Sequence, residues 1–177
     1  MALALSLGRR GQGNVWPNPA VGCVIAQGNR IVGRGWTQPG GRPHAEPQAL
    51  AQAGEAARGA TVYVTLEPCS HHGKTPPCAQ ALIDAGVARV VIATQDDDAR
   101  VNGRGIAMLR TAGIEVEVGV RESEARADHA GFFCRTDLGR PMLTLKLANS
   151  FDGRIATGTG KASGSPTLRR GGCPCHA

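Results

Sequence analysis

Short β-rich runs alternate along this chain with segments of helix-forming residues, and this alternation limits the fold more than any other feature. The runs at 21–25 and 30–34 are separated by Gln27-Gly28-Asn29, which favours a tight hairpin turn. Similar patterns predict further strands at 60–66, 89–94 and 114–118, and helices at 2–10, 45–57, 78–85 and 106–112. Strands and helices that alternate in this way predict an α/β sandwich around a single sheet.

Length and composition narrow the class of protein further. A chain of 177 residues is long enough for one ordinary domain with a tail. It has no apolar run near the roughly 18 to 20 residues of a membrane helix, so no membrane association is expected. The apolar start at 1–8 has no basic region before it, so we interpret it as a helix and expect a cytoplasmic protein with reduced cysteines.

The formal net charge of +6 raises the question of nucleic-acid binding. The arginines are scattered, and the two Trp, one Tyr and three Phe form no aromatic platform with interleaved Arg for stacking bases. Solvated surface charge, or binding of a small phosphorylated substrate, accounts for the net positive charge as well as nucleic-acid binding does. We therefore expect a small-molecule partner and no nucleic acid.

Three residues match the ligand set of a catalytic zinc site, in which His and Cys supply three ligands and leave a fourth position open. His44 and Cys78 stand at predicted helix starts, and Cys69 follows a predicted strand within a Pro68-Cys69 turn. The positive end of the helix dipole is expected to lower the pKa of the Cys78 thiol. The sequence predicts one Zn²⁺ per chain.

Glu46 follows His44 by two residues and is the predicted proton carrier of this site. Zinc deaminases pair a non-ligand Glu with such a centre, although the eight residues between Cys69 and Cys78 depart from their short Cys-x-x-Cys spacing. Two alternatives stay open on these residues. One is a non-catalytic zinc-stabilised binding module with Glu46 as a helix N-terminal charge, and the other is a deaminase of nucleic-acid bases.

Longer strings around these residues resemble the deaminase half of the bifunctional riboflavin-biosynthesis deaminase-reductase family. They are PNPAVGCVI at 17–25, PHAE at 43–46 and VTLEPCSHHGKTPPC at 64–78, and shorter matches follow at 146–148 and 152–154. The resemblance implies a cytidine-deaminase-like three-layer α/β/α sandwich around a mixed sheet. It also implies zinc-dependent hydrolytic deamination of 2,5-diamino-6-(5-phosphoribosylamino)pyrimidin-4(3H)-one to the 5-aminouracil product.

The same resemblance assigns Asn18, His71, Lys74 and Asp96 to substrate binding. An Asn offers a donor and an acceptor to a pyrimidinone edge, and a Lys offers a point charge to phosphate. From the residues alone, Asn18 is equally a turn former and Lys74 a solvated loop charge. The chain reads Asp96-Asp97-Asp98-Ala99 where the family usually has Asp-Pro-Asn-Pro or Asp-Pro-Asp-Pro, and three adjacent acids are expected to repel a phosphate.

The resemblance also predicts the domain organisation: a deaminase domain at 1–145, a remnant of the start of the reductase domain at 146–160, and a disordered tail at 161–177. In the remnant, 146–157 matches the first strand of the reductase domain, and the tail is interpreted as translated in a shifted frame. A reductase domain truncated in this way implies that NADP is not a cofactor. A homo-oligomer is expected by analogy with the family.

Overall fold

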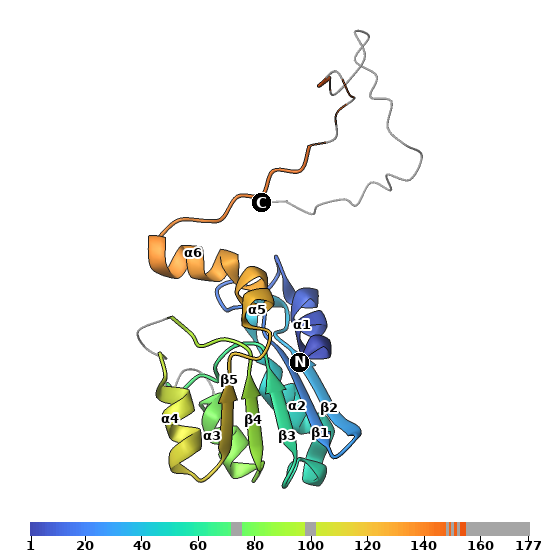
Figure 1. Ribbon diagram of the computed structural model, residues 1–177, viewed down its shortest axis with the longest axis vertical. Coiled ribbons are helices and arrows are strands. Elements are labelled where there is room, and N and C mark those ends of the chain that lie inside the picture. The colour runs from blue at the N-terminus through green and yellow to red at the C-terminus, as the bar shows by residue number, and fades with distance from the viewer. Residues whose placement is uncertain (72–75, 98–101, 148, 150, 152, 155–177) are drawn as a thin grey trace. The chain divides into compact units, whose positions relative to one another are not determined.

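The computed structural model describes residues 1–71, 76–97, 102–147, 149, 151, 153 and 154, which form two compact units, Met1–Met142 and Leu143–Ala177 (Figure 1). The first unit contains a mixed five-stranded sheet in the order β2-β1-β3-β4-β5. Its strands are β1 (Gly22–Gln27), β2 (Arg30–Trp36), β3 (Thr61–Val64), β4 (Arg89–Ile92) and β5 (Glu115–Val118). The first two strands form the predicted hairpin, and β1 pairs antiparallel with β3, while β3, β4 and β5 run parallel.

Helices cover one face of the sheet with a large apolar core. They are α2 (Ala45–Ala53), α3 (Cys78–Asp84) and α4 (Arg104–Thr111), and short 3-10 turns lie at Pro39–Gly41 and Gly54–Ala57. Alternate strand residues, among them Ile25, Val62 and Ile92, pack in the same cluster as Leu82 of α3 and Leu109 of α4. All five side chains are almost completely buried, as expected for a face that is closed by helices.

The opposite face is covered by α1 (Ala2–Gly8), which continues as a 3-10 turn over Arg9–Gly11. Val24 and Tyr63, the residues that alternate with those of the main core, pack here with Ala4 and Leu7. The helix approaches the sheet so closely that a Cβ added to Gly22 would lie 1.9 Å from the carbonyl oxygen of Ala4. Helices on both faces of a mixed sheet confirm the predicted three-layer α/β/α fold.

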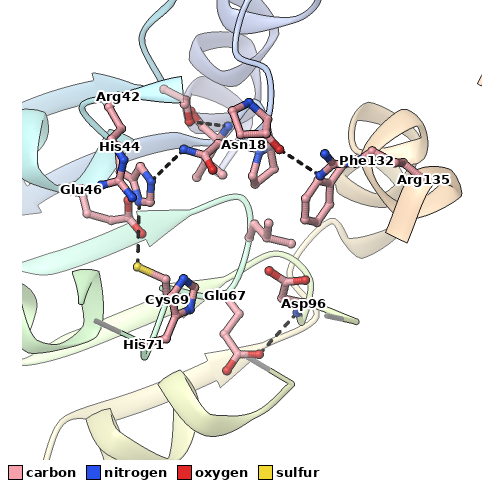
Figure 2. Close-up of a pocket in the computed structure, with 15 residues that line it drawn as sticks. Asn18, Arg42, His44, Glu46, Glu67, Cys69, His71, Asp96, Phe132 and Arg135 are labelled. Carbon is pink, nitrogen blue, oxygen red and sulfur yellow. Dashed lines mark hydrogen bonds between the residues drawn. The ribbon is translucent and has the colours of Figure 1, made fainter. Parts of the chain in front are cut away.

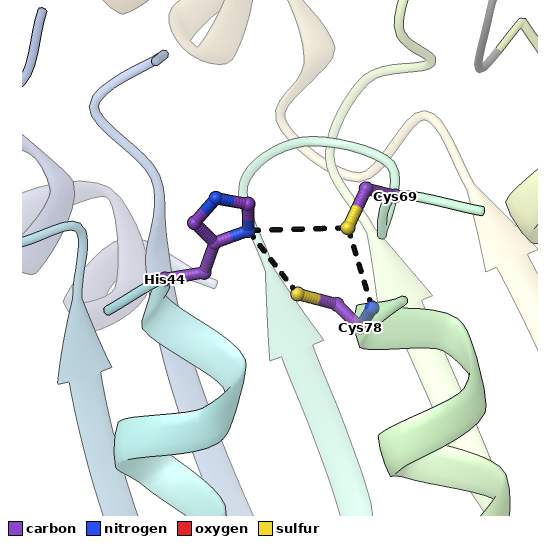
Figure 3. A group of neighbouring side chains, drawn as sticks. All are labelled: His44, Cys69 and Cys78. Carbon is purple, nitrogen blue, oxygen red and sulfur yellow. Dashed lines mark hydrogen bonds between the residues drawn. The ribbon is translucent and has the colours of Figure 1, made fainter. Parts of the chain in front are cut away.

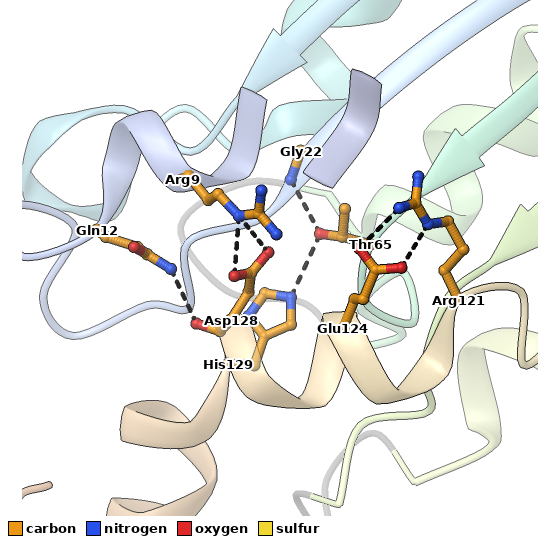
Figure 4. Close-up of polar contacts among 8 residues, drawn as sticks. All are labelled: Arg9, Gln12, Gly22, Thr65, Arg121, Glu124, Asp128 and His129. Carbon is orange, nitrogen blue, oxygen red and sulfur yellow. Dashed lines mark hydrogen bonds and ion pairs between the residues drawn. The ribbon is translucent and has the colours of Figure 1, made fainter. Parts of the chain in front are cut away.

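Two further helices follow the last strand, α5 (Glu122–Asp128) and α6 (Ala130–Leu138), which the sequence analysis did not predict. Asp128 of α5 accepts hydrogen bonds from the Arg9 guanidinium at 3.0 and 2.9 Å, so α5 is held beside α1 (Figure 4). His129, between the two helices, is buried with its Nε2 3.3 Å from the Thr65 hydroxyl oxygen. That oxygen also accepts the Gly22 N–H, so α5 and α6 are tied to the ends of β1 and β3.

In the second unit, the described residues 143–147, 149, 151, 153 and 154 adopt no helix or strand. A strand of the kind matched at 146–157, isolated from its sheet, is expected to pack opportunistically or to fray. The domain boundaries at 145 and 160 stay predictions. The expected tail at 161–177 lies outside the described residues. Within the described part of the chain, no helix has both the length and the apolar character needed to cross a lipid bilayer.

A candidate metal centre and its cleft

The three predicted ligands lie together at the carboxyl end of the parallel strands (Figure 3). His44 immediately precedes α2 in an extended conformation, and Cys78 is the first residue of α3. Cys69 comes from the loop that leaves β3, and the N–H of Cys78 donates to its sulfur at 3.3 Å. Two helix starts and one strand end thus bring residues from distant parts of the sequence to one point.

The distances among these ligand atoms suit a small tetrahedral metal ion. His44 Nδ1 lies 3.3 Å from Cys78 Sγ and 3.9 Å from Cys69 Sγ, and the three ligand atoms lie within 4.8 Å of one another. Zinc bonds to N and S of about 2.0 to 2.3 Å place neighbouring ligand atoms of a tetrahedron about 3.5 to 3.8 Å apart. Only small side-chain movements would therefore bring all three atoms onto one zinc ion.

The pKa values of the two cysteine thiols are shifted in opposite directions, and the prediction that the pKa of Cys78 is lowered was wrong. Hydrogen bonding from Cys78, together with His44, lowers the pKa of Cys69 to about 4. The pKa of Cys78 is instead raised well above its usual value, first by its hydrogen bond to Cys69 and then by burial. Without metal, one proton therefore stays on Cys78 next to the Cys69 thiolate, and a dication would displace it.

Asn18 fixes the orientation of the His44 ring. Its Nδ2 donates to the Gly41 carbonyl at 2.7 Å and lies 3.3 Å from His44 Nε2, so Nδ1 faces the two sulfurs. Gly41 has φ +83°, and a Cβ there would lie 2.7 Å from Asn18 Nδ2. The turn before α2 therefore requires glycine for this contact.

Glu46 lies in the first turn of α2 and is only 4% exposed. Burial raises the pKa of its carboxyl to about 7, and the Cys69 thiolate adds to the increase. A carboxyl with a pKa near the working pH can accept and return a proton with similar ease. Because Glu46 follows the candidate ligand His44 by two residues, a group that can transfer protons lies beside the metal centre.

A cleft of about 230 Å³ opens above the candidate metal centre (Figure 2). Glu46, Asn18, His71 and Asp96 line it together with His44 and Cys69. Asp96 follows β4 and is buried, whereas His71 is exposed. Lys74, the predicted phosphate contact, lies outside the described residues. The structure thus brings Glu46 and the described candidates for substrate binding to one cleft with His44 and Cys69. Cys78 does not line this cleft but lies beside these two ligands.

Glu67 is a buried residue of this cleft, and the sequence predicts no role for it. Its Oε1 accepts the N–H groups of Gly105 and Ile106 at 2.9 and 3.2 Å. Its Oε2 accepts those of Gly103 and Asp96 at 3.0 and 3.4 Å. One carboxylate therefore connects the loop after β3, which carries Cys69, to the loop after β4 and to the start of α4. A Glu before Pro-Cys gives no local signal of such distant partners.

Helix α6 contributes a wall of the cleft that was also missed, and α5 pairs with the loop beside it. Phe132 and Arg135 of α6 line the cleft, and Arg126 of α5 pairs with Asp97 at 2.7 Å. This ion pair offsets one of the three adjacent acids that were expected to repel a phosphate. The other departures from the family pattern, Asp98 and Ala99, lie outside the described residues.

Comparison with known proteins agrees with this geometry. Residues 1–94 match the family model described as the cytidine and deoxycytidylate deaminase zinc-binding region. The Aquifex aeolicus riboflavin biosynthesis protein RibD is 52% identical over 162 residues, which cover 92% of this chain and 46% of that protein. The diaminohydroxyphosphoribosylamino-pyrimidine deaminase of Buchnera aphidicola subsp. Schizaphis graminum is 46% identical over 141 residues, covering 80% of this chain and 96% of that protein.

Among solved structures, the deaminase/reductase of Thermotoga maritima superposes with a TM-score of 0.84 at 42% identity. The match covers 92% of this chain and 47% of that protein. The chain thus spans about half the length of its RibD relatives, while it matches nearly the whole of the Buchnera deaminase.

Proposed function

Because this chain belongs to the zinc-binding family of cytidine and deoxycytidylate deaminases, and within it to the riboflavin-pathway deaminases, we propose that it deaminates a phosphorylated diaminopyrimidinone. The substrate would be 2,5-diamino-6-(5-phosphoribosylamino)pyrimidin-4(3H)-one. Water replaces the 2-amino group as a carbonyl oxygen, and ammonia leaves. The observation that carries this proposal is the buried Glu46 carboxyl, which lies next to the His44, Cys69 and Cys78 cluster in an open cleft.

The donor set fits a resident Zn²⁺, held by His44, Cys69 and Cys78. Zinc bound there would supply Lewis-acid activation of water near neutral pH. Glu46 takes the proton of the attacking water and delivers it to the ring nitrogen beside the reacting carbon. It then takes the proton of the hydroxyl group newly bonded to that carbon and passes it to the amino group, which leaves as ammonia while the carbonyl forms, so the carboxyl ends each turnover in the state in which it began. A pKa of about 7 suits both halves of this task.

The other cleft residues would bind and orient the substrate. Asn18 can present its amide to the pyrimidinone edge, and its contact with His44 keeps that edge next to the reacting centre. Asp96 is positioned by the hydrogen bond between its N–H and Glu67, and its carboxylate would accept hydrogen bonds from ribose hydroxyls. His71 and Lys74 are proposed to contact the remainder of the phosphoribosyl group.

The direct test is ammonium release from this substrate by zinc-loaded protein, with cytidine and single-stranded DNA as comparison substrates. We expect one ammonium per pyrimidine converted, and much slower release from cytidine or DNA. A zinc-loaded, folded protein that releases ammonium from none of them would support the non-catalytic binding module instead. Preferential release from DNA would support a deaminase of nucleic-acid bases.

A further inference from the structure

Arg135 projects from α6 into the wall of the cleft, far along the chain from the motifs that carry the metal ligands. Its guanidinium stacks on two aromatic rings, with its carbon 4.6 Å from the centre of the Trp16 ring and 5.4 Å from that of Phe132. Figure 2 shows Arg135 across the cleft from His44 and Glu46, with Asn18 between them. The side chain is thus held in place at the end of the cleft away from the metal centre.

The polar contacts of Arg135 leave most of its donors available. Its Nη2 donates to the Pro17 carbonyl at 2.9 Å, a neutral partner. Among the residues that the structure describes, no carboxylate pairs with Arg135. By contrast, Arg9, Arg121 and Arg126 each pair with an acid at 2.9 Å or less. A partly buried guanidinium with five N–H donors and no counterion is suited to binding an anion.

Two described arginines line the cleft, Arg42 next to the candidate ligand His44 and Arg135 on α6. An anion at the His44 end would meet the buried acid Glu46 as well as Arg42, whereas Arg135 lies at the other end. Asp97, next to this wall, is already paired with Arg126. A substrate whose amino group lies at the metal centre would therefore place its negatively charged end toward α6.

We propose that Arg135 binds the phosphate of the substrate, in addition to the contact proposed for Lys74, and makes the enzyme prefer the phosphorylated form, an inference that rests on the proposed function. The planar guanidinium can offer two parallel N–H groups to two phosphate oxygens. Stacking on Trp16 and Phe132 orders the side chain before the substrate arrives, which reduces the entropy lost on binding. Arg135 would then determine specificity without taking part in the proton transfers.

The test compares Arg135→Gln with the wild type on the phosphorylated substrate and on its dephosphorylated analogue. Loss of a charged hydrogen bond should raise KM for the phosphorylated substrate about 10- to 100-fold. KM for the dephosphorylated analogue should change less than about threefold. Inorganic phosphate should inhibit turnover of the analogue by the wild type and not by the variant. Arg10→Gln is the matched control, because Arg10 also stacks on a tryptophan, Trp36, at 5.1 Å but does not line this cleft.

Failure of this inference and failure of the proposed function give different results. A wild type that deaminates neither substrate would refute the proposed function. A wild type that deaminates both, with a variant whose KM rises equally for both, would mean that Arg135 only supports the 16–18 loop through Pro17. Should the variant not fold, the Arg135 Nε–H NMR signal of the zinc-loaded wild type can be followed during titration with inorganic phosphate. A shift of that signal is expected, and an unchanged signal at high phosphate would overturn the inference.

Discussion

Replacement of Glu67 by Gln should destabilise the protein far more than an isosteric change normally does. The wild-type carboxylate accepts four backbone N–H groups, two on each oxygen. An amide keeps only one acceptor oxygen, and its NH₂ group would face two N–H donors. Whichever way the amide is turned, two backbone donors near a buried position lose their partner.

The magnitude follows from those two orphaned donors. Each buried polar group left without a partner costs about 1 to 3 kcal/mol, so the free energy of unfolding should fall by about 2 to 6 kcal/mol. The two backbone N–H groups that lose their acceptor are either those of Asp96 and Gly103 or those of Gly105 and Ile106. In either case the loop after β4 loosens, and KM should rise more than kcat falls, because Asp96 is a proposed substrate contact.

Urea unfolding at a fixed zinc concentration measures this loss, with steady-state kinetics on the same preparation. Glu55→Gln is the matched control, because Glu55 is exposed and its replacement should change stability by less than about 0.5 kcal/mol. A Glu67→Gln protein as stable as that control would refute the assigned hydrogen-bond network.

Three further perturbations test other parts of the account. Cys69→Ala and Cys78→Ala should each bind less than one zinc per chain by metal analysis and lower the unfolding midpoint, since metal binding contributes to folding; full zinc occupancy in either would contradict the ligand assignment. Burial lowers the pKa of His129 to about 4, so below about pH 6.5 the unfolded chain binds a proton that the folded chain does not. Between pH 7.5 and 5 the wild type should therefore lose about 2 kcal/mol of stability that His129→Gln does not lose, and parallel pH curves would contradict this. Lys74→Ala should raise KM for the phosphorylated substrate and not for its dephosphorylated analogue, and equal increases would exclude a phosphate contact.

The elements that the sequence predicts well are those with a strong local pattern. The hairpin of β1 and β2 follows from two apolar runs around Gln27-Gly28-Asn29, and β3 and β4 from short β-branched runs. Helices α5 and α6 were missed because charged residues and Gly131 interrupt their apolar positions. Their helical state depends on contacts such as His129 with Thr65, which join distant parts of the chain.

The candidate site also contains residues that the local sequence predicts and residues that only the tertiary structure reveals. The first kind comprises His44, Glu46, Cys69 and Cys78, which stand in short sequence motifs whose chemistry can be inferred without a structure. Glu67 and Arg135, in contrast, act through partners that are 29 to 39 and 118 residues away, respectively. The direction of the Cys78 pKa shift was predicted incorrectly because the helix dipole can be inferred from the local sequence, whereas the hydrogen bond to Cys69 and the burial of Cys78 depend on the tertiary structure.

The central claim is that Glu46 moves the protons of a zinc-dependent deamination, and one comparison tests it most directly. Ammonium release from the phosphorylated diaminopyrimidinone is measured for zinc-loaded wild type, Glu46→Gln and the control Glu55→Gln, with zinc content determined on each sample. Glu46→Gln should retain one zinc per chain and lose turnover by at least the 10² to 10⁴-fold that general acid-base catalysis typically contributes, while Glu55→Gln should match the wild type. Wild-type turnover by zinc-loaded Glu46→Gln would contradict the account.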